Sequence, residues 1–244
     1  MLERKLKFCL QKIMGYHHYL FVFAKFCITR MGFGHYEKSF VHFMQLVPSD
    51  GIILDIGANI GVMSVLLARK FPRSSIYAFE PIPSNILTFK RIMNSCKISN
   101  VTLIETAVGN KNGEIKMALP IIENVRYQGL CHILQQDASE NEATNILYTV
   151  PIAKLDDALF MDSKQSIVAI KMDVENYEFE VLKGARELIN KHKPIVYTEL
   201  WSNEVRGACI DFFKKNGYSV KVFQKNELKE YTHQEEINFF FIPS

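Results

Sequence analysis

The sequence predicts an α/β fold in which a mostly parallel sheet is covered by helices on both faces and is completed by a C-terminal antiparallel hairpin. Three observations support this fold class. Apolar runs alternate with helix-like stretches, a glycine-containing turn joins the first such run to a helix, and two strand-like runs end the chain. The strands are expected near residues 52–57, 75–80, 101–106, 166–172 and 194–200, and the helices near 60–70, 84–95 and 176–191.

Residues 1–50 are predicted to form a helical appendage or lid, which leaves residues 51–244 for the α/β domain. Residues 1–30 contain six basic residues and one acidic residue, so their formal charge is 6 − 1 = +5, whereas the whole chain carries +3. Aromatic side chains accompany this charge, and we expect them to pack on the domain or to cover the active site. Peripheral contact with a membrane surface or an anionic partner is the alternative.

No membrane span or secretory leader is expected in this segment. The apolar run from Leu20 to Ala24 is too short to cross a bilayer, and Lys25 interrupts it. Gln11 and Lys12 break the apolar core that a signal peptide would need. The chain is therefore expected to be cytoplasmic.

The first predicted strand leads into the most informative stretch of the chain, Ile52-Ile-Leu-Asp-Ile-Gly-Ala-Asn-Ile-Gly61. A strand, a glycine turn and a helix in this order bring backbone N–H groups and a helix N-terminus close to a bound nucleotide. A dinucleotide site has a glycine where this chain has Asn59, because the backbone must clear a pyrophosphate there. Asp55 adds a carboxylate, which would repel phosphates but suits a ligand that carries an ammonium and a sulfonium. The turn therefore indicates S-adenosylmethionine, and its expected binding residues are Asp55, Gly57, Ala58, Asn59 and Gly61.

The second predicted strand ends in Glu80, 25 residues after Asp55, and Pro81 terminates it. This separation is typical of one strand–helix–strand unit. A carboxylate at this strand end is positioned to accept hydrogen bonds from two ribose hydroxyls, with Pro81 beside it. The third strand borders the nucleoside in such a sheet, so the residues that follow it are expected to flank the adenine. These are Glu105, Thr106 and Ala107.

Several further motifs accompany this unit, in order and at compatible spacing, and together the chain resembles the FkbM-like methyltransferases over roughly residues 50–200. The motifs are Asp55-Ile-Gly-Ala-Asn-Ile-Gly61, Ala78-Phe-Glu-Pro81, Ala107-Val-Gly-Asn110 with Gly113-Glu114, Leu155-Asp-Asp157, and Ile170-Lys-Met-Asp-Val-Glu175 with Glu178, Leu182 and Gly184-Ala185. The family usually has a glycine after its Asp-Val-Glu, where this chain has Asn176, a residue that also tolerates a left-handed backbone.

This resemblance implies a Rossmann-like methyltransferase sheet of seven strands, mostly parallel, whose last hairpin would come from residues 218–224 and 237–242. It also implies S-adenosylmethionine as the cofactor and O-methylation of a hydroxyl on a glycan or a secondary metabolite. Residues 113–152 form the least patterned part of the domain, with short strands expected at 114–119 and 146–152. A long connection of this kind is usually functional, and we assign it to acceptor recognition.

Carboxylates that follow the fourth and fifth predicted strands are the catalytic candidates, because the carboxyl ends of parallel strands converge on the ligand crevice. The resemblance implies that Asp173 lies beside the transferred methyl group, as a base or as a group that orients the acceptor. Glu175 and Glu199 are the next candidates. Further along the helix, Glu178, Glu180 and Glu187 are expected on a solvated face.

Other classes of protein fit the sequence less well. Five scattered cysteines and the histidine spacing form no disulfide framework or metal site, so no protein-bound metal is expected. Nucleic acid is disfavoured as a partner, because positive charge is concentrated in the first 30 residues instead of along an aromatic groove. Two alternatives stay open: a non-catalytic protein that binds S-adenosylmethionine, which Asn176 favours, and an NAD-dependent oxidoreductase, against which Asn59 counts.

Overall fold

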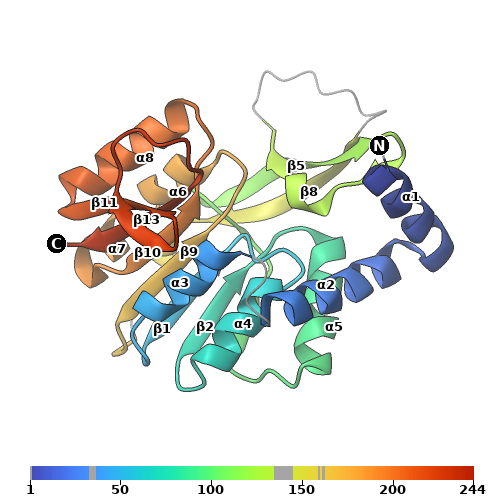
Figure 1. Ribbon diagram of the computed structural model, residues 1–244, viewed down its shortest axis with the longest axis horizontal. Coiled ribbons are helices and arrows are strands. Elements are labelled where there is room, and N and C mark those ends of the chain that lie inside the picture. Colours follow the sequence, from blue (N-terminus) through green and yellow to red (C-terminus); the bar gives the residue numbers. More distant parts are fainter. Residues whose placement is uncertain (1, 33–36, 135–144, 159, 161–162) are drawn as a thin grey trace.

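A long, twisted sheet forms the centre of the computed structural model, which describes residues 2–32, 37–134, 145–158, 160 and 163–244 (Figure 1). Eight strands make up this main sheet: β1 (Ile52–Ile56), β2 (Ser75–Phe79), β3 (Val101–Ile104), β9 (Ile167–Met172), β10 (Ile195–Glu199), β11 (Tyr218–Gln224), β12 (Glu227–Glu230) and β13 (Asn238–Pro243). Their spatial order is β12-β11-β13-β10-β9-β1-β2-β3. The pairs from β10 to β3 are parallel, and β13 runs antiparallel to both of its neighbours.

Strands near the middle of this sheet are apolar because both of their faces are covered. All five residues of β1 are buried. One face packs on α6 (Glu178–Lys183), α7 (Arg186–His192) and α8 (Glu204–Lys215), and the other on α3 (Lys38–Leu46), α4 (Val62–Lys70) and α5 (Pro83–Ser95). The predicted α/β class with helices on both faces is therefore confirmed.

The N-terminal segment contains three helices that make different contacts. The helix α3 belongs to the core, since Phe40 and Phe43 are fully buried and their rings pack against Tyr197 of β10. The helix α2 (Tyr16–Gly32) lies on α4 and α5, whereas α1 (Leu2–Met14) reaches the edge of a second sheet (Figure 1). In the described residues, no helix is long and apolar enough to span a membrane.

A second, smaller sheet occupies the segment that was expected to be irregular. It contains β4 (Ala107–Val108), β5 (Gly113–Ile122), β6 (Val125–Arg126), β7 (His132–Ile133) and β8 (Asn145–Ala153). The two predicted short strands are longer than expected and pair antiparallel as β5 and β8. The turn η1 (Gln128–Leu130) joins β6 to β7. Residues 135–144, which make up the polar part of this segment, lie outside the described residues.

Two details of the main sheet and its helices differ from expectation. The helix predicted for 176–191 is divided into α6 and α7 at Gly184, where the backbone lies so close to Gly109 that a Cβ atom would overlap its carbonyl oxygen. The expected seven-stranded sheet has an eighth strand, because β12 pairs with β11 through a tight turn at Lys225 and Asn226, both of which have positive φ. Without β12, seven strands remain in the main sheet.

Candidate active site

The turn between β1 and α4 depends on residues with left-handed backbone. Gly57, Asn59 and Gly61 have φ angles of 74°, 52° and 84°. The N–H groups of Gly57 and Ala58 both donate to the carbonyl oxygen of Phe79 at the end of β2, at 3.1 and 2.9 Å. A Cβ atom on Gly57 would overlap the backbone carbonyl oxygen of Asp173, which follows β9. Glycine is therefore needed where the backbones after β1 and β9 come closest.

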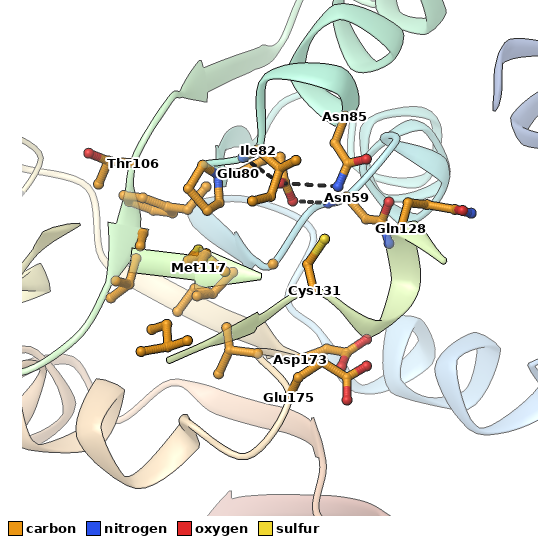
Figure 2. A pocket seen from close by; sticks show the side chains of 18 of the residues that line it. Asn59, Glu80, Ile82, Asn85, Thr106, Met117, Gln128, Cys131, Asp173 and Glu175 are labelled. Carbon is orange, nitrogen blue, oxygen red and sulfur yellow. Dashed lines mark hydrogen bonds between the residues drawn. The ribbon is translucent and has the colours of Figure 1, made fainter. Parts of the chain in front are cut away.

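Glu80 receives hydrogen bonds from three directions at the end of β2. Its Oε2 atom accepts from the backbone N–H of Asn59 at 2.8 Å, and Oε1 accepts from Ile82 N at 2.9 Å and from Asn85 Nδ2 at 3.2 Å (Figure 2). Burial raises the pKa of Glu80 to about 7, although these three donors oppose the shift. The carboxylate is therefore held rigidly at the wall of a pocket.

A buried charge pair lies beneath the turn. Lys171, in the middle of the apolar strand β9, brings its Nζ atom within 3.4 Å of Asp55 Oδ1 and donates to the carbonyl oxygen of Gly57 at 3.0 Å. The other carboxylate oxygen of Asp55 accepts from the hydroxyl of Ser64 at 2.5 Å. Burial alone lowers the pKa of Lys171, but attraction by Asp55 and Asp173 outweighs it, so the net shift is upward. Lys171 therefore stays charged and links the strand to the turn.

Carboxylates gather after β9 and β10, on the side of the pocket opposite Glu80 (Figure 2). Asp173 lies 3.9 Å from Lys171 and projects into the pocket with Glu175. Burial and the negative charges of Asp173, Glu199 and Glu178 raise the pKa of Glu175 to about 7. Burial, Asp173 and Glu37 do the same for Glu199. The site therefore holds carboxyl groups that exchange protons near neutral pH.

Glu178 corrects one expectation from the sequence. It was expected on a solvated helix face, but it is almost fully buried, and its Oε1 atom accepts from the backbone N–H of Val174 at 3.3 Å. Burial raises its pKa to about 7, against the effect of its backbone hydrogen bonds. The helix α6 begins directly at this residue, so its first turn packs against the strand end instead of facing water.

The turn after β9 also has unusual backbone geometry. Glu175 and Asn176 have φ angles of 52° and 69°, so Asn176 adopts the left-handed conformation that its amide side chain tolerates. Its Oδ1 atom accepts from Nδ2 of Asn203, which caps α8. The side chain therefore connects this turn to the loop after β10, a contact that glycine would not make.

The pocket between these two groups is closed on a third side by the second sheet. Met117 of β5, Gln128 and Gly129 of η1, and Cys131 and Ile133 at β7 contribute to its wall (Figure 2). In Figure 2, Cys131 lies between Glu80 and the pair formed by Asp173 and Glu175. The segment assigned to acceptor recognition therefore borders the same pocket as the strand ends.

The structure brings eight of the sequence-predicted site residues to this pocket and leaves five outside its lining. Those that line it are Gly57, Asn59, Glu80, Pro81, Thr106, Ala107, Asp173 and Glu175.

The five others have separate positions. Asp55 lies beneath the turn, Ala58 packs on Phe89, and Gly61 begins α4, where a Cβ atom would crowd Phe89. Glu105 is on the surface and pairs with Lys90 at 2.5 Å. Glu199 acts on Glu175 through charge.

Some site residues were not predicted from the sequence. They include Asn85, Met117, Gln128 and Cys131, which line the pocket, and Lys171, which lies beneath the turn. For Lys171 there was a signal, since a lysine inside an apolar strand is rarely buried without a partner. No signal was available for the second-sheet residues, because their position depends on how β5 and β8 fold over the strand ends.

Two buried amide oxygens make the pocket suited to a ligand that donates hydrogen bonds. Within the described residues, Oδ1 of Asn59 and Oδ1 of Asn85 find no hydrogen-bond partner. The backbone N–H of Asn59 and Nδ2 of Asn85 both donate to Glu80, so both residues lie beside this carboxyl group. Ribose hydroxyls or an amino group match this donor requirement, whereas phosphate groups do not. Among the same residues, no cluster of His, Cys, Asp or Glu is arranged to hold a metal ion; that none is required stays a prediction.

The strand order, the glycine turn and the carboxylate after β2 define the chain as a Rossmann-like protein with the sheet of a methyltransferase. It belongs to the FkbM methyltransferase family: the methyltransferase FkbM domain matches residues 55–220. The family suggested by the ordered motifs is thereby confirmed.

Curated relatives carry methyltransferase names. Methyltransferase 1 of Beauveria bassiana (strain ARSEF 2860) is 28% identical over 152 residues, which cover 56% of this chain and 59% of the relative. Methyltransferase sdnD of Sordaria araneosa is 29% identical over 163 residues, covering 58% and 62%. The 2-O-methyltransferase NoeI of Sinorhizobium fredii (strain NBRC 101917 / NGR234) is 26% identical over 166 residues, covering 66% and 67%. The match thus spans about three fifths of the first two relatives.

Among solved structures, a methyltransferase FkbM from Methylobacillus flagellatus KT superimposes with a TM-score of 0.53 and 16% sequence identity. The superposition covers 81% of this chain and 45% of that protein. At this level of identity the likeness supports the fold alone.

Proposed function

We propose that this chain binds S-adenosylmethionine and transfers its methyl group to a hydroxyl oxygen of a glycan or a secondary metabolite. The observation that carries the proposal is a single pocket with two different walls. One wall is the glycine turn with Glu80, and the other is formed by Asp173 and Glu175. A nucleoside-binding wall that faces a cluster of carboxylates suits transfer of a group from a cofactor to a polar acceptor.

Several residues of the chain suit the nucleoside part of the cofactor. Glu80 would accept hydrogen bonds from the ribose hydroxyls, and Asn59 Oδ1 and Asn85 Oδ1 offer further acceptors beside it. Thr106 and Ala107 would flank the adenine. Asp55 would act indirectly, by holding Lys171 and hence the carbonyl oxygen of Gly57. When bound, the cofactor supplies an electrophilic methyl group on its sulfonium.

The opposite wall is suited to an acceptor hydroxyl. Asp173 lines the pocket and lies close to the buried Lys171, a position that makes it suitable for orienting the hydroxyl. Glu175 has a pKa of about 7, near the value at which a general base works best at neutral pH. Glu199, which does not line the pocket, would be a positioning residue, because its charge contributes to the raised pKa of Glu175. Transfer to oxygen also agrees with the name of the relative 2-O-methyltransferase NoeI.

Calorimetry with S-adenosylmethionine and with NAD tests the cofactor. We expect micromolar affinity for S-adenosylmethionine and weaker binding of NAD. Glu80→Gln should reduce the affinity about tenfold or more, since a buried carboxylate that accepts from hydroxyls contributes roughly 1.5–3 kcal/mol. Glu105→Gln is the matched control, because Glu105 is outside the pocket lining, and it should bind like the wild type. Preference for NAD, or equal affinities of both variants, would contradict the proposal.

The reaction is tested separately, by uptake of a labelled methyl group into hydroxyl-bearing glycans and metabolites. Asp173→Asn and Glu175→Gln should keep cofactor binding but lose most of the transfer rate, about a hundredfold for loss of a general base. Cofactor binding with no transfer by the wild type to any acceptor would favour the alternative of a non-catalytic binding protein.

A further inference from the structure

The first two helices expose apolar side chains along their outer surfaces. Leu6 and Ile13 of α1 are 58% and 81% exposed, and Val22 and Phe26 of α2 are 42% and 56% exposed. Single exposed apolar residues are common, but four on two consecutive helices form an unusual concentration. We call these four side chains, with the exposed Lys5 and Lys12, the outer face of α1 and α2.

The contacts of α1 determine which of its sides faces outward. Gln11 exchanges two hydrogen bonds of 3.1 Å with the backbone of Arg126, and Arg4 pairs with Glu123 at 2.6 Å. The rest of the helix has four exposed residues, Lys5, Leu6, Lys12 and Ile13. Lys5 and Lys12 are seven residues apart, and so are Leu6 and Ile13, so each pair lies on one side of the helix, and the two pairs are adjacent. Leu6 and Ile13 thus form an apolar stripe that is flanked by lysines.

Charge restricts what can cover this face. Residues 4–32 contain six basic residues, Arg4, Lys5, Lys7, Lys12, Lys25 and Arg30, and no acidic residue. Since the chain carries +3 in total, the remaining residues carry 3 − 6 = −3. A second copy that docked by twofold symmetry would place one strongly basic segment against another, which is repulsive. A surface of anionic lipid head groups is complementary both to the charge and to the apolar stripe.

We propose that the outer face of α1 and α2 binds an anionic membrane surface. The two helices lie in the plane of the interface, with Leu6, Ile13, Val22 and Phe26 at the boundary between head groups and acyl chains and with Lys5 and Lys12 against the head groups. The helix α1 contacts β6, and η1, which follows β6, lines the pocket, so α1 is connected to the side of the pocket that the second sheet closes. This inference does not rest on the proposed methyl transfer.

Sedimentation of the full chain with extruded vesicles tests this inference. The vesicles contain phosphatidylcholine alone or with about 30 mol% phosphatidylglycerol, an anionic fraction large enough to attract basic segments. The wild-type chain should sediment with the anionic vesicles at about 0.1 M salt and much less at about 0.5 M, where charges are screened. Binding to neutral vesicles should be at least tenfold weaker.

Two variants of the outer face are compared with two matched controls. Lys5→Glu with Lys12→Glu, and Leu6→Ser with Ile13→Ser, should each reduce the partition coefficient about tenfold or more, since each basic residue contributes roughly a factor of five. Lys214→Glu with Lys215→Glu changes two exposed lysines at the end of α8 by the same charge, and Leu87→Ser removes an apolar side chain that is 55% exposed on α5. Both controls should bind like the wild type.

Three results would overturn the inference. The first is no sedimentation of the wild type with anionic vesicles at low salt. The second is an equal loss of binding in the controls and in the outer-face variants. The third is a concentration-dependent dimer of the wild type that disappears only in the outer-face variants, which would assign this face to a contact between copies. Because all the substituted residues are exposed, urea unfolding should show that the variants fold.

Discussion

The two walls of the pocket both carry a carboxyl group with a pKa of about 7, but for different reasons. Glu80 lies on the wall proposed to hold the cofactor; burial raises its pKa, and three hydrogen-bond donors oppose this shift. Glu175 lies on the wall proposed to hold the acceptor; burial raises its pKa together with the like charges of Asp173, Glu199 and Glu178. One wall is organised by hydrogen bonds, and the other holds unfavourable electrostatic interactions.

This difference separates two ways to build a site. Two backbone N–H groups hold Glu80 in position, so the wall proposed for the cofactor is preorganised. Crowded carboxylates cost stability, and such local conflicts are typical of functional positions. Lys171 lies between the walls, in contact with Asp55 and Gly57 on one side and near Asp173 on the other. Lys171 therefore links the two walls.

The largest effect is expected from Lys171→Met, which removes the link between the walls. Asp55 would remain buried without its counter-ion, so the free energy of unfolding should fall by about 3–5 kcal/mol. The loss is measured by urea denaturation near neutral pH. Cofactor binding should weaken as well, because the carbonyl oxygen of Gly57 loses its donor.

Lys183→Met is the control for this change, since Lys183 pairs with Glu180 at the surface at 2.6 Å. It should cost less than about 1 kcal/mol. Adding Asp55→Asn to Lys171→Met should restore part of the stability, because the buried charge is then removed. Equal losses for Lys171→Met and Lys183→Met would show that the buried pair does not hold the two walls together.

A smaller loss is expected from Gly57→Ala, which tests whether the cofactor wall needs close approach of two backbones. The new Cβ atom would overlap the carbonyl oxygen of Asp173, in addition to the strain of a φ angle of 74°. Together these effects should cost about 2–4 kcal/mol in urea denaturation.

Gly217→Ala separates the two contributions. Gly217 has a φ angle of 75°, but open space surrounds the position of its Cβ atom. This variant should lose only about 1–2 kcal/mol, and the difference between the variants measures the overlap. If both variants are destabilised equally, the approach of Asp173 is not what requires glycine in the turn.

The smallest effect is expected from Glu178→Gln, which relieves part of the strain on the acceptor wall. The pKa of Glu178 is raised from 4.5 to about 7 in the folded protein, so the stability linked to its protonation is complete below about pH 4.5 and is lost as pH rises through 7. Relative to the wild type, the variant should gain roughly 2–3 kcal/mol between pH 5 and pH 8, since one pKa unit corresponds to about 1.4 kcal/mol.

Urea denaturation across this pH range measures the gain, and Glu187→Gln, on the exposed surface of α7, is the control. The control should show no comparable trend. A stability difference for Glu178→Gln that does not depend on pH would mean that burial of this carboxyl group is not costly in the folded protein.

Local patterns in the sequence were sufficient to predict the strands of the main sheet and the wall of the pocket formed by the glycine turn and Glu80. Short apolar runs bounded by turn residues predict buried strands, and Ile52–Ile56 and Ile167–Met172 are two such runs. The glycine turn and Glu80 belong to one strand–helix–strand unit, so their relation is set over a short stretch of chain. The division of the helix after β9 and the close approach of Gly184 to Gly109 at that point were not predicted, because Gly109 is distant in the sequence.

The sequence by itself determined the fold class, the family and which strand ends border the pocket, because these follow from periodicity and from closely spaced motifs. Only the tertiary structure decided that Asp55 pairs with Lys171 beneath the turn, that Glu178 is buried, and that Cys131 and Gln128 close the pocket. These relations join distant segments; Lys171 and Gly57, for example, are 114 residues apart along the chain. Burial and distance across a sheet, which set pairing and pKa values, become defined only when such segments pack together.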